Sequence, residues 1–101
     1  MRIISGYFKG KKIFLPKDKL TRPLRDLVKE SIFNLIDHSN KFNFSIKNSN
    51  VLDLFSGTGS FGIECISRHA KKITFIESYK EALNVLKKNI STFKLEDKCK
   101  I

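Results

Sequence analysis

The stretch that decides the fold is "VLDLFSGTGSFG", residues 51–62. An apolar run passes into three glycines with the spacing G-x-G-x-x-G, and an apolar helical pattern begins directly after them. This succession of strand, glycine loop and helix is typical of nucleotide-cofactor sites. Gly57 permits a tight turn, Gly59 lets a ligand approach the backbone, and Gly62 lets the helix pack close to the strand.

On either side of this loop the sequence predicts alternating strands and helices. We expect strands at 51–55 and 72–77, helices at 61–68 and 79–93, and a third strand opening in "KCKI" at 98–101. The buried face of the second helix is predicted to carry Ala82, Leu83, Leu86, Ile90 and Phe93. The order β-α-β-α-β predicts an α/β fold with a parallel, doubly wound sheet.

The amino-terminal half predicts a hairpin and one helix. Residues 2–5 and 12–15 are short β-prone runs, and Gly6 and Gly10 between them are available for positive φ. A helix is expected from an N-cap at Thr21 to about residue 37, with Pro23 in its first turn. Its expected apolar stripe is Leu24, Leu27, Val28, Ile32, Leu35 and Ile36, with Phe33 beside it. After it, Phe42, Phe44 and Ile46 are expected to turn inward.

Length and composition exclude several classes. The chain of 101 residues has no apolar run long enough to cross a bilayer and no secretory signal at its amino terminus. Cys65 and Cys99 lie far apart, without the spacing of a metal site or a redox pair. We expect a reduced, cytoplasmic protein with two incidental thiols, no metal and no membrane partner.

Charge is unevenly distributed. The chain has 20 basic and 10 acidic residues, a net charge of +10. Residues 1–29 hold nine basic side chains and two acids, so 9 − 2 = +7 resides there. A concentrated basic segment suits a polyanion, because each neutralised phosphate releases counterions. A merely solvated surface explains the same count, so charge alone leaves both readings open.

Two acids bear on the choice of cofactor. Glu77 lies 20 residues beyond Gly57, at the end of the second strand, where a carboxylate can bind both ribose hydroxyls. NAD and S-adenosylmethionine sites share this feature. Asp53 lies where a dinucleotide fold has an apolar strand residue, and a buried carboxylate is costly without a partner. A cationic methionine group would be such a partner, so Asp53 favours S-adenosylmethionine. The alternative is an Asp that caps its own turn.

These residues carry a resemblance to known enzymes. The segment "VLDLFSGTGSFGIECISRHAKKITFIE" resembles motif I through motif II of class I methyltransferases. "MRIISGYFKGKKIFLP" followed by "TRPLRDLVKESIFNLI" resembles the amino-terminal portion of the RsmD family, the bacterial 16S ribosomal RNA guanine-N2 methyltransferases. The resemblance covers nearly the whole chain. Its most specific residues are the Thr21-Arg22-Pro23 start, Glu30, Phe33 and Asn34.

The resemblance implies a fold and a set of sites. It implies an amino-terminal β-hairpin and helix, residues 1–49, that face ribosomal RNA of the small subunit. Residues 50–101 would be the first half of a Rossmann-like S-adenosylmethionine-binding domain. The implied cofactor residues are Asp53, Phe55, Gly57, Gly59 and Glu77, and the implied RNA-binding residues are Arg2, Lys9, Lys11, Lys12, Arg22 and Arg25. Arg22 and Arg25 are the better phosphate ligands, because a guanidinium can bind bidentately.

The chain departs from the family pattern at two places. Leu24 and Arg25 stand where relatives have a small or hydroxyl residue and then Ser or Thr, which puts the helix N-terminal contacts in doubt. His69 stands where relatives have Gly, at a helix end that needs a left-handed backbone. We therefore predict His69 to be a C-cap and not a catalyst. His38, at a polar helix end, is predicted to face solvent.

A third departure is the absence of the family's catalytic tetrapeptide, Asn or Asp followed by Pro-Pro and an aromatic residue. The chain's only prolines are Pro16 and Pro23, so no catalytic residue is assigned. We expect a methyltransferase fragment, truncated or split, that is inactive and poorly stable unless a separately encoded carboxyl-terminal half completes it. The alternative is a non-catalytic, basic RNA-binding relic. An NAD-dependent oxidoreductase is disfavoured by Asp53.

Overall fold

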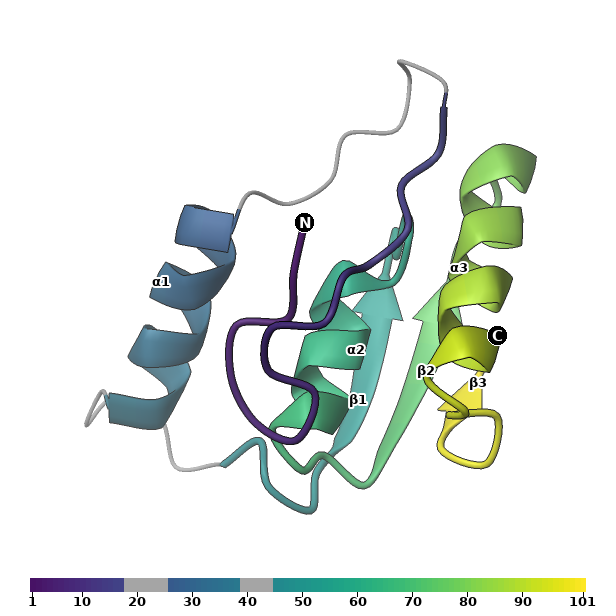
Figure 1. Cartoon of the computed structure of the whole chain (residues 1–101). Helices are drawn as coiled ribbons and strands as arrows, with labels where there is room; N and C mark the ends of the chain where they lie inside the picture. Colours follow the sequence, from purple (N-terminus) through teal and green to yellow (C-terminus); the bar gives the residue numbers. More distant parts are fainter. Residues whose placement is uncertain (18–25, 39–44) are drawn as a thin grey trace.

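The computed structural model describes residues 1–17, 26–38 and 45–101, which form a parallel sheet with helices packed against it (Figure 1). The strands lie in the order β1-β2-β3, and both neighbouring pairs are parallel. Along the chain the elements are α1 (Asp26–His38), β1 (Asn50–Leu54), α2 (Ser60–Ser67), β2 (Lys72–Ile76), α3 (Lys80–Thr92) and β3 (Cys99–Lys100). The predicted order after residue 50 is confirmed, and the expected ends of β1, α2, β2 and α3 are within one residue.

One face of the sheet is covered by α2 and α3. Strand β2 turns Ile73 and Phe75 to this face, and both side chains are almost fully buried. A β-carbon at Gly62 on α2 would collide with the ring of Phe75, which explains why the close packing of helix and strand needs glycine there. The predicted buried face of α3 is also confirmed, with Ala82, Leu86, Ile90 and Phe93 buried and Leu83 partly buried.

The opposite face of the sheet is bare in the part of the chain that the structure describes. Leu52 and Leu54 alternate with Val51 and Asp53 along β1, and their side chains are 61% and 57% exposed. Leu54 lies beside Ile76 in the register of β1 and β2, and Ile76 is 50% exposed. Parallel strands are normally covered on both faces. The described chain supplies one of these two layers.

The predicted apolar stripe of α1 is largely wrong. Leu27 and Leu35 are 76% and 60% exposed, whereas Phe33 and the charged Lys29 are fully buried. The helix packs through this other face because the ring of Phe33 stacks on Phe61 of α2, with 4.9 Å between ring centroids, and Lys29 reaches a buried carboxylate. The expected helix start, with Thr21, Pro23 and Leu24, lies outside the described residues.

The first 17 residues turn back as predicted, but the two expected strands do not form a regular ladder. Within this described segment one antiparallel bridge pairs Arg2 with Lys12, and Gly6 and Gly10 have φ values of 86° and 85°. A β-carbon at Gly6 would collide with the backbone of Ser67, so the hairpin lies closely against the end of α2. Figure 1 shows the hairpin crossing α2 between α1 and α3.

The sequence also makes predictions for the two histidines and for three apolar residues after α1. His69 follows Arg68, the C-cap of α2, and its φ of 75° confirms the left-handed backbone expected there. His38 is exposed in the last turn of α1 as expected. Ile46 is buried as expected, while Phe42 and Phe44 lie outside the described residues. Within the described ranges, no helix combines the length and apolar character that crossing a membrane requires.

Candidate functional site at the glycine loop

The glycine loop lies at the carboxyl edge of the sheet, between the end of β1 and the start of α2. Gly57 and Gly59 have φ values of 58° and 87°, the left-handed conformation that glycine adopts without strain. Ser56 fastens the loop to both strands. Its N–H donates to the carbonyl of Ile76 at 3.0 Å, and its hydroxyl donates to the carbonyl of Asp53 at 2.6 Å. Open α/β sheets bind ligands at this edge.

Glu77 directly follows β2 and reaches across to the loop. Its Oε1 accepts a 2.7 Å hydrogen bond from the N–H of Gly57, and its Oε2 accepts a 2.9 Å bond from the N–H of Tyr79. The N–H of the first loop glycine is therefore committed to a carboxylate. Each carboxylate oxygen keeps a second lone pair, which can accept a hydrogen bond from a ligand hydroxyl.

Asp53 lies at the loop end of β1, on the covered side of the sheet. Burial raises the pKa of its carboxyl from 3.8 to about 6; a hydrogen bond from the backbone of Gly62 opposes this rise, and the charge of Glu77 adds to it. Its Oδ2 is buried and has no hydrogen-bond partner in the described parts of the chain. An unpaired buried carboxylate oxygen is costly, so the site favours a ligand that brings a cation or a hydrogen-bond donor.

The remaining expected cofactor residues are arranged differently. Gly59 is the N-cap of α2, and a β-carbon there would collide with Leu86, so its missing side chain leaves room for the core and not for a ligand. Phe55 has a φ of 57° and is 92% exposed, so its ring projects outward beside the loop. The structure thus joins Gly57 and Glu77 directly and sets Asp53 within electrostatic range of Glu77, while Phe55 forms an outer rim.

The predicted RNA-facing residues of the hairpin, where described, are all exposed. They are Arg2, Lys9, Lys11 and Lys12. The guanidinium of Arg2 also donates a 2.9 Å hydrogen bond to the carbonyl of Gly10. Arg22 and Arg25 lie outside the described residues.

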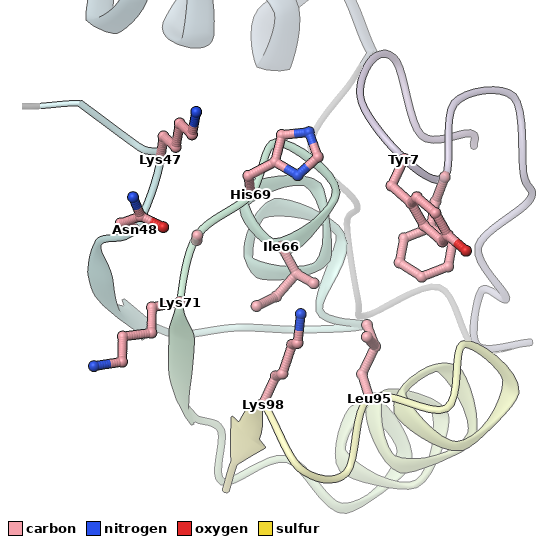
Figure 2. A pocket seen from close by; sticks show the side chains of 10 residues that line it. Tyr7, Lys47, Asn48, Ile66, His69, Lys71, Leu95 and Lys98 are labelled. Carbon is pink, nitrogen blue, oxygen red and sulfur yellow. The ribbon is translucent and has the colours of Figure 1, made fainter.

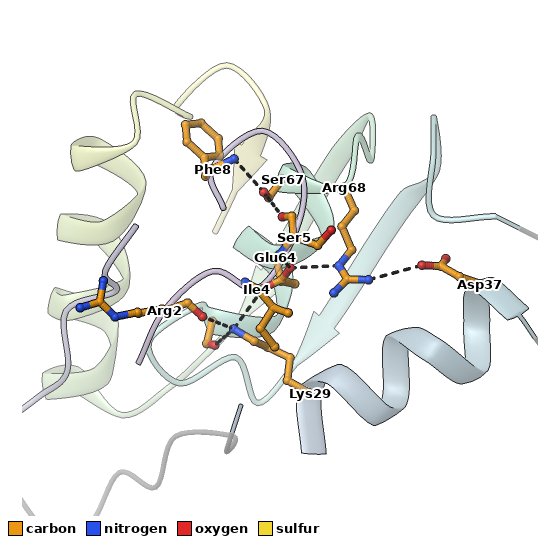
Figure 3. Close-up of polar contacts among 10 residues, drawn as sticks. Arg2, Ile4, Ser5, Phe8, Lys29, Asp37, Glu64, Ser67 and Arg68 are labelled. Carbon is orange, nitrogen blue, oxygen red and sulfur yellow. Dashed lines mark hydrogen bonds and ion pairs between the residues drawn. The ribbon is translucent and has the colours of Figure 1, made fainter. Parts of the chain in front are cut away.

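Lys29 contributes to the +7 of residues 1–29, but it is not on the surface. Its side chain is fully buried, and its ammonium lies 3.2 Å from Oε1 of Glu64. The same ammonium donates to the carbonyl of Arg2 and the hydroxyl of Ser60, both at 3.1 Å (Figure 3). One of the nine basic side chains in this segment is therefore unavailable to a polyanion.

Glu64 on α2 is the centre of a buried polar cluster that sequence reasoning missed (Figure 3). Its oxygens accept hydrogen bonds from the N–H groups of Ile4 and Ser5, at 2.9 and 3.1 Å, and from Nε of Arg68 at 3.0 Å. The available signal was a carboxylate in the middle of the apolar run "FGIECI". A fully buried carboxylate needs charged or hydrogen-bonding partners, and here the front segment and Lys29 provide them.

Asn89 on α3 holds the glycine loop from its other side, and it was also missed. Its Oδ1 accepts from the N–H of Phe14 at 2.8 Å, and its Nδ2 donates to the carbonyl of Phe14 at 3.1 Å. The same Nδ2 donates to the carbonyl of Thr58 in the loop at 2.9 Å. One fully buried amide therefore ties the end of the hairpin to the glycine loop.

The two cysteines do not form a reactive site. Burial raises the pKa of the Cys65 thiol to about 12 and that of the Cys99 thiol to about 11, so both stay protonated near neutral pH. Over residues 1–17, 26–38 and 45–101, no three His, Cys, Asp or Glu side chains group in a way that could hold a metal ion.

The comparison with protein families agrees with this geometry. The whole chain, residues 1–101, matches the family model described as "Conserved hypothetical protein 95". The chain belongs to this family. The match, together with the relatives described next, confirms the resemblance to the RsmD family.

Two curated relatives have the same name, ribosomal RNA small subunit methyltransferase D. Ribosomal RNA small subunit methyltransferase D from Haemophilus influenzae is 43% identical over 94 residues, which are 93% of this chain and 46% of that protein. The protein of the same name from Escherichia coli K12 is 35% identical over 94 residues, 93% of this chain and 44% of that protein. The chain thus spans less than half the length of these curated relatives.

Solved structures confirm the fold within the family. The structure described as "Putative methyltransferase yhhF from Escherichia coli" superposes with a TM-score of 0.81 at 31% identity, covering 99% of this chain and 49% of that one. A methylase structure from Haemophilus influenzae, described there as putative, gives a TM-score of 0.68 at 40% identity, covering 98% and 48%. The chain has the α/β fold of these proteins over about half of their length.

Proposed function

We propose that this chain is the cofactor-binding part of an S-adenosylmethionine-dependent RNA methyltransferase that acts on N2 of a guanine in small-subunit ribosomal RNA. The observation that carries the proposal is the Oδ2 of Asp53, which is buried beside a glycine loop and has no hydrogen-bond partner among the described residues. The names of the curated relatives support the RNA methyltransferase class.

The charges at the loop favour this cofactor over a dinucleotide. The carboxylates of Asp53 and Glu77 interact electrostatically, so together they attract a cation and repel a pyrophosphate. In this proposal Asp53 holds the cationic methionine end, Glu77 accepts hydrogen bonds from the ribose, and the backbone of the loop from Gly57 to Gly59 lies against the cofactor. Phe55 borders the outer side of the cofactor site. When bound, the cofactor supplies an electrophilic methyl group.

RNA is proposed to lie along the basic front of the molecule. The exposed Arg2, Lys9, Lys11 and Lys12 offer four positive charges on one short hairpin. Neutralising phosphates there would release counterions and give a salt-dependent affinity. Arg22 and Arg25 are proposed as further phosphate ligands from their sequence position.

The pocket for the target guanine is proposed to come from a second polypeptide segment. The chain has no Pro-Pro tetrapeptide, and the bare face with Leu52, Leu54 and Ile76 is suited to a carboxyl-terminal half that completes the sheet. Alone, the chain is proposed to bind cofactor without transferring methyl groups. The exposed basic side chains of the hairpin also fit the alternative, a non-catalytic RNA-binding module, which predicts RNA binding without cofactor binding.

Titration calorimetry of the chain with S-adenosylmethionine tests the cofactor assignment. We expect binding of S-adenosylmethionine and none of NADH. Glu77→Ala should weaken binding by about 1–3 kcal/mol, because a hydrogen-bonding carboxylate is lost from the ribose site. Glu81→Ala, which removes an exposed acid from the first turn of α3, is the matched control and should change little.

Two results would change the proposal. Unchanged affinity in Glu77→Ala would remove this residue from the site. A chain that binds RNA but not S-adenosylmethionine would support the non-catalytic module instead.

A further inference from the structure

A cleft of about 630 Å³ opens at the amino-terminal edge of the sheet, at the end opposite the glycine loop (Figure 2). Its walls come from four segments: the hairpin, the residues before β1, the end of α2 with the turn that follows it, and the residues before β3. A volume of this size falls within the range of small-molecule and cofactor pockets. No residue of the proposed cofactor site lines it.

The parallel topology gathers three lysines around this cleft. Lys47 precedes β1, Lys71 precedes β2 and Lys98 precedes β3, and parallel strands all begin at the same edge. All three are exposed, and no acid is among the lining residues. Figure 2 shows the amino group of Lys98 directed toward the middle of the cleft, below Ile66, whereas the amino groups of Lys47 and Lys71 point outward from its rim. Three positive charges at one edge of the sheet, with no acid among the lining residues, favour an anion there.

The cleft is held open by backbone hydrogen bonds between its walls. The N–H of Asn48 donates to the carbonyl of His69 at 2.8 Å. The N–H of Lys71 donates to the carbonyl of Ser49 at 2.7 Å. These bonds fix the segment before β1 against the turn after α2, so the cleft exists before any ligand arrives. Preformed sites bind with a smaller entropic cost.

An exposed aromatic ring stands at the cleft beside an apolar floor. Tyr7 is 78% exposed, and its ring packs edge-on against Phe8 at 4.9 Å between centroids. Its N–H is fixed to the carbonyl of Ser67 at 2.8 Å. Buried Ile66 and Leu95 form the apolar floor. Aromatic rings next to lysines are the usual platform for unpaired bases of single-stranded nucleic acid.

We propose that this cleft binds an unpaired nucleotide of RNA, with its phosphates beside Lys47, Lys71 and Lys98 and its base against Tyr7. This inference rests on the proposed function in one respect, namely that RNA is the partner. It adds a contact surface at the end of the sheet away from the cofactor loop. Because the hairpin supplies Tyr7 as well as the exposed Lys9, the cleft adjoins the basic front.

Binding of a fluorescent single-stranded RNA of mixed sequence, measured by anisotropy over a range of salt, tests the cleft. Lys71→Gln/Lys98→Gln should raise Kd about tenfold and reduce the slope of log K against log salt by about 1.4, because each lost phosphate contact removes about 0.7. Lys87→Gln/Lys100→Gln removes the same charge from exposed positions outside the cleft and should change both quantities much less. All four lysines are exposed, so circular dichroism should show unchanged folds.

A second variant tests the base contact. Tyr7→Ala should raise the Kd for RNA about tenfold, because one stacked base is lost. Inorganic polyphosphate carries the charges without the bases, so its affinity should not change in Tyr7→Ala. If both ligands respond equally to Tyr7→Ala, or neither does, the nucleotide assignment is overturned.

A hairpin variant, Lys9→Gln/Lys12→Gln, separates failure of the cleft from failure of the proposed function. Suppose that the hairpin variant loses affinity for RNA while Lys71→Gln/Lys98→Gln changes it no more than Lys87→Gln/Lys100→Gln does. That result overturns the proposal about the cleft but still supports RNA as the partner. If the wild-type chain binds no RNA, both proposals about RNA are overturned. The cofactor assignment is judged separately, by calorimetry.

Discussion

The two faces of the sheet differ sharply in how much of their apolar side chains is exposed. On β2, Ile73 on one face is 1% exposed under α2 and α3, while Ile76 on the other face is 50% exposed. On β1, Leu52 and Leu54 share the bare face, and Asp53 lies on the covered one. The bare face is thus the more apolar along β1, and the covered face carries the carboxylate of the candidate site.

Apolar residues in a parallel strand indicate that helices cover them, but the described chain covers only one of the two faces. A strand that is apolar on both faces is suited to a parallel sheet with two layers of helices. The described chain has helices over one face, so Leu52, Leu54 and Ile76 have no cover of their own. The same substitution should therefore lower stability much more on the covered face than on the bare face.

The largest difference is expected from the same substitution on the two faces. Ile73→Ala should lower the free energy of unfolding by about 2–5 kcal/mol, because it opens a cavity under the helices. Ile76→Ala should lower it by no more than about 1 kcal/mol, because half of that side chain already contacts solvent. Urea unfolding followed by circular dichroism measures both. Equal losses would mean that the bare face is covered in solution.

A smaller effect of opposite sign is expected at Asp53. The folded-state pKa of about 6 lies above the ordinary value of 3.8, so the folded chain binds more protons than the unfolded chain between these values. Stability therefore falls as pH rises from about 4 to about 6 and stays low above that. Asp53→Asn abolishes this fall. Allowing for the partial exposure of the group, the variant should be more stable by about 1–2 kcal/mol at about pH 8.

The same variant should lose cofactor affinity, so stability and binding are expected to change in opposite directions. Thermal unfolding at several pH values measures the first change, and calorimetry measures the second. Asp97→Asn removes an exposed carboxylate and serves as the control. If Asp53→Asn loses stability at every pH, the carboxylate has a structural partner and the cofactor assignment is weakened.

The smallest change in unfolding free energy is expected on the bare face. Leu52→Lys should alter it by less than about 0.5 kcal/mol, because the side chain is mostly exposed. The same change should reduce self-association, since an uncovered apolar face beside an open strand edge is a template for pairing. Sedimentation equilibrium measures the mass. Leu35→Lys, on the exposed side of α1, is the control; an equal drop in association there would implicate α1 instead.

Sequence reasoning succeeded where the determining residues are close together in the chain. The glycine loop and its flanking strand and helix lie together within residues 50–67, and positive φ at Gly57, Gly59 and His69 follows from local turn chemistry. The meeting of Gly57 and Glu77 also follows from topology, because adjacent parallel strands end at the same edge.

Sequence reasoning failed where a residue distant in the chain determines whether a side chain is buried. The apolar side of α1 was expected inside, but Lys29 is buried because Glu64, 35 positions away, compensates its charge. The two arms of the hairpin do pair, as in the bonds from the N–H groups of Ile3 and Ile13 to the carbonyls of Lys11 and Met1. Sequence reasoning did not find that side chains of Glu64 and Ser67 bind the N–H groups of Ile4, Ser5 and Phe8. Periodicity carries no information on such partners. The cleft with Lys47, Lys71 and Lys98 likewise depends on segments that are distant in the sequence and meet only in the folded sheet.

The attachment of the hairpin to Glu64 also sets an order of events during synthesis. The N–H groups of Ile4 and Ser5 bond to a carboxylate 60 and 59 residues further along the chain. At a translation rate of about 5–20 residues per second, Glu64 is made roughly 3–12 seconds after these two residues. Ile4 and Ser5 must therefore stay solvated until α2 has been made. These residues reach their native positions only after residues that are synthesised later.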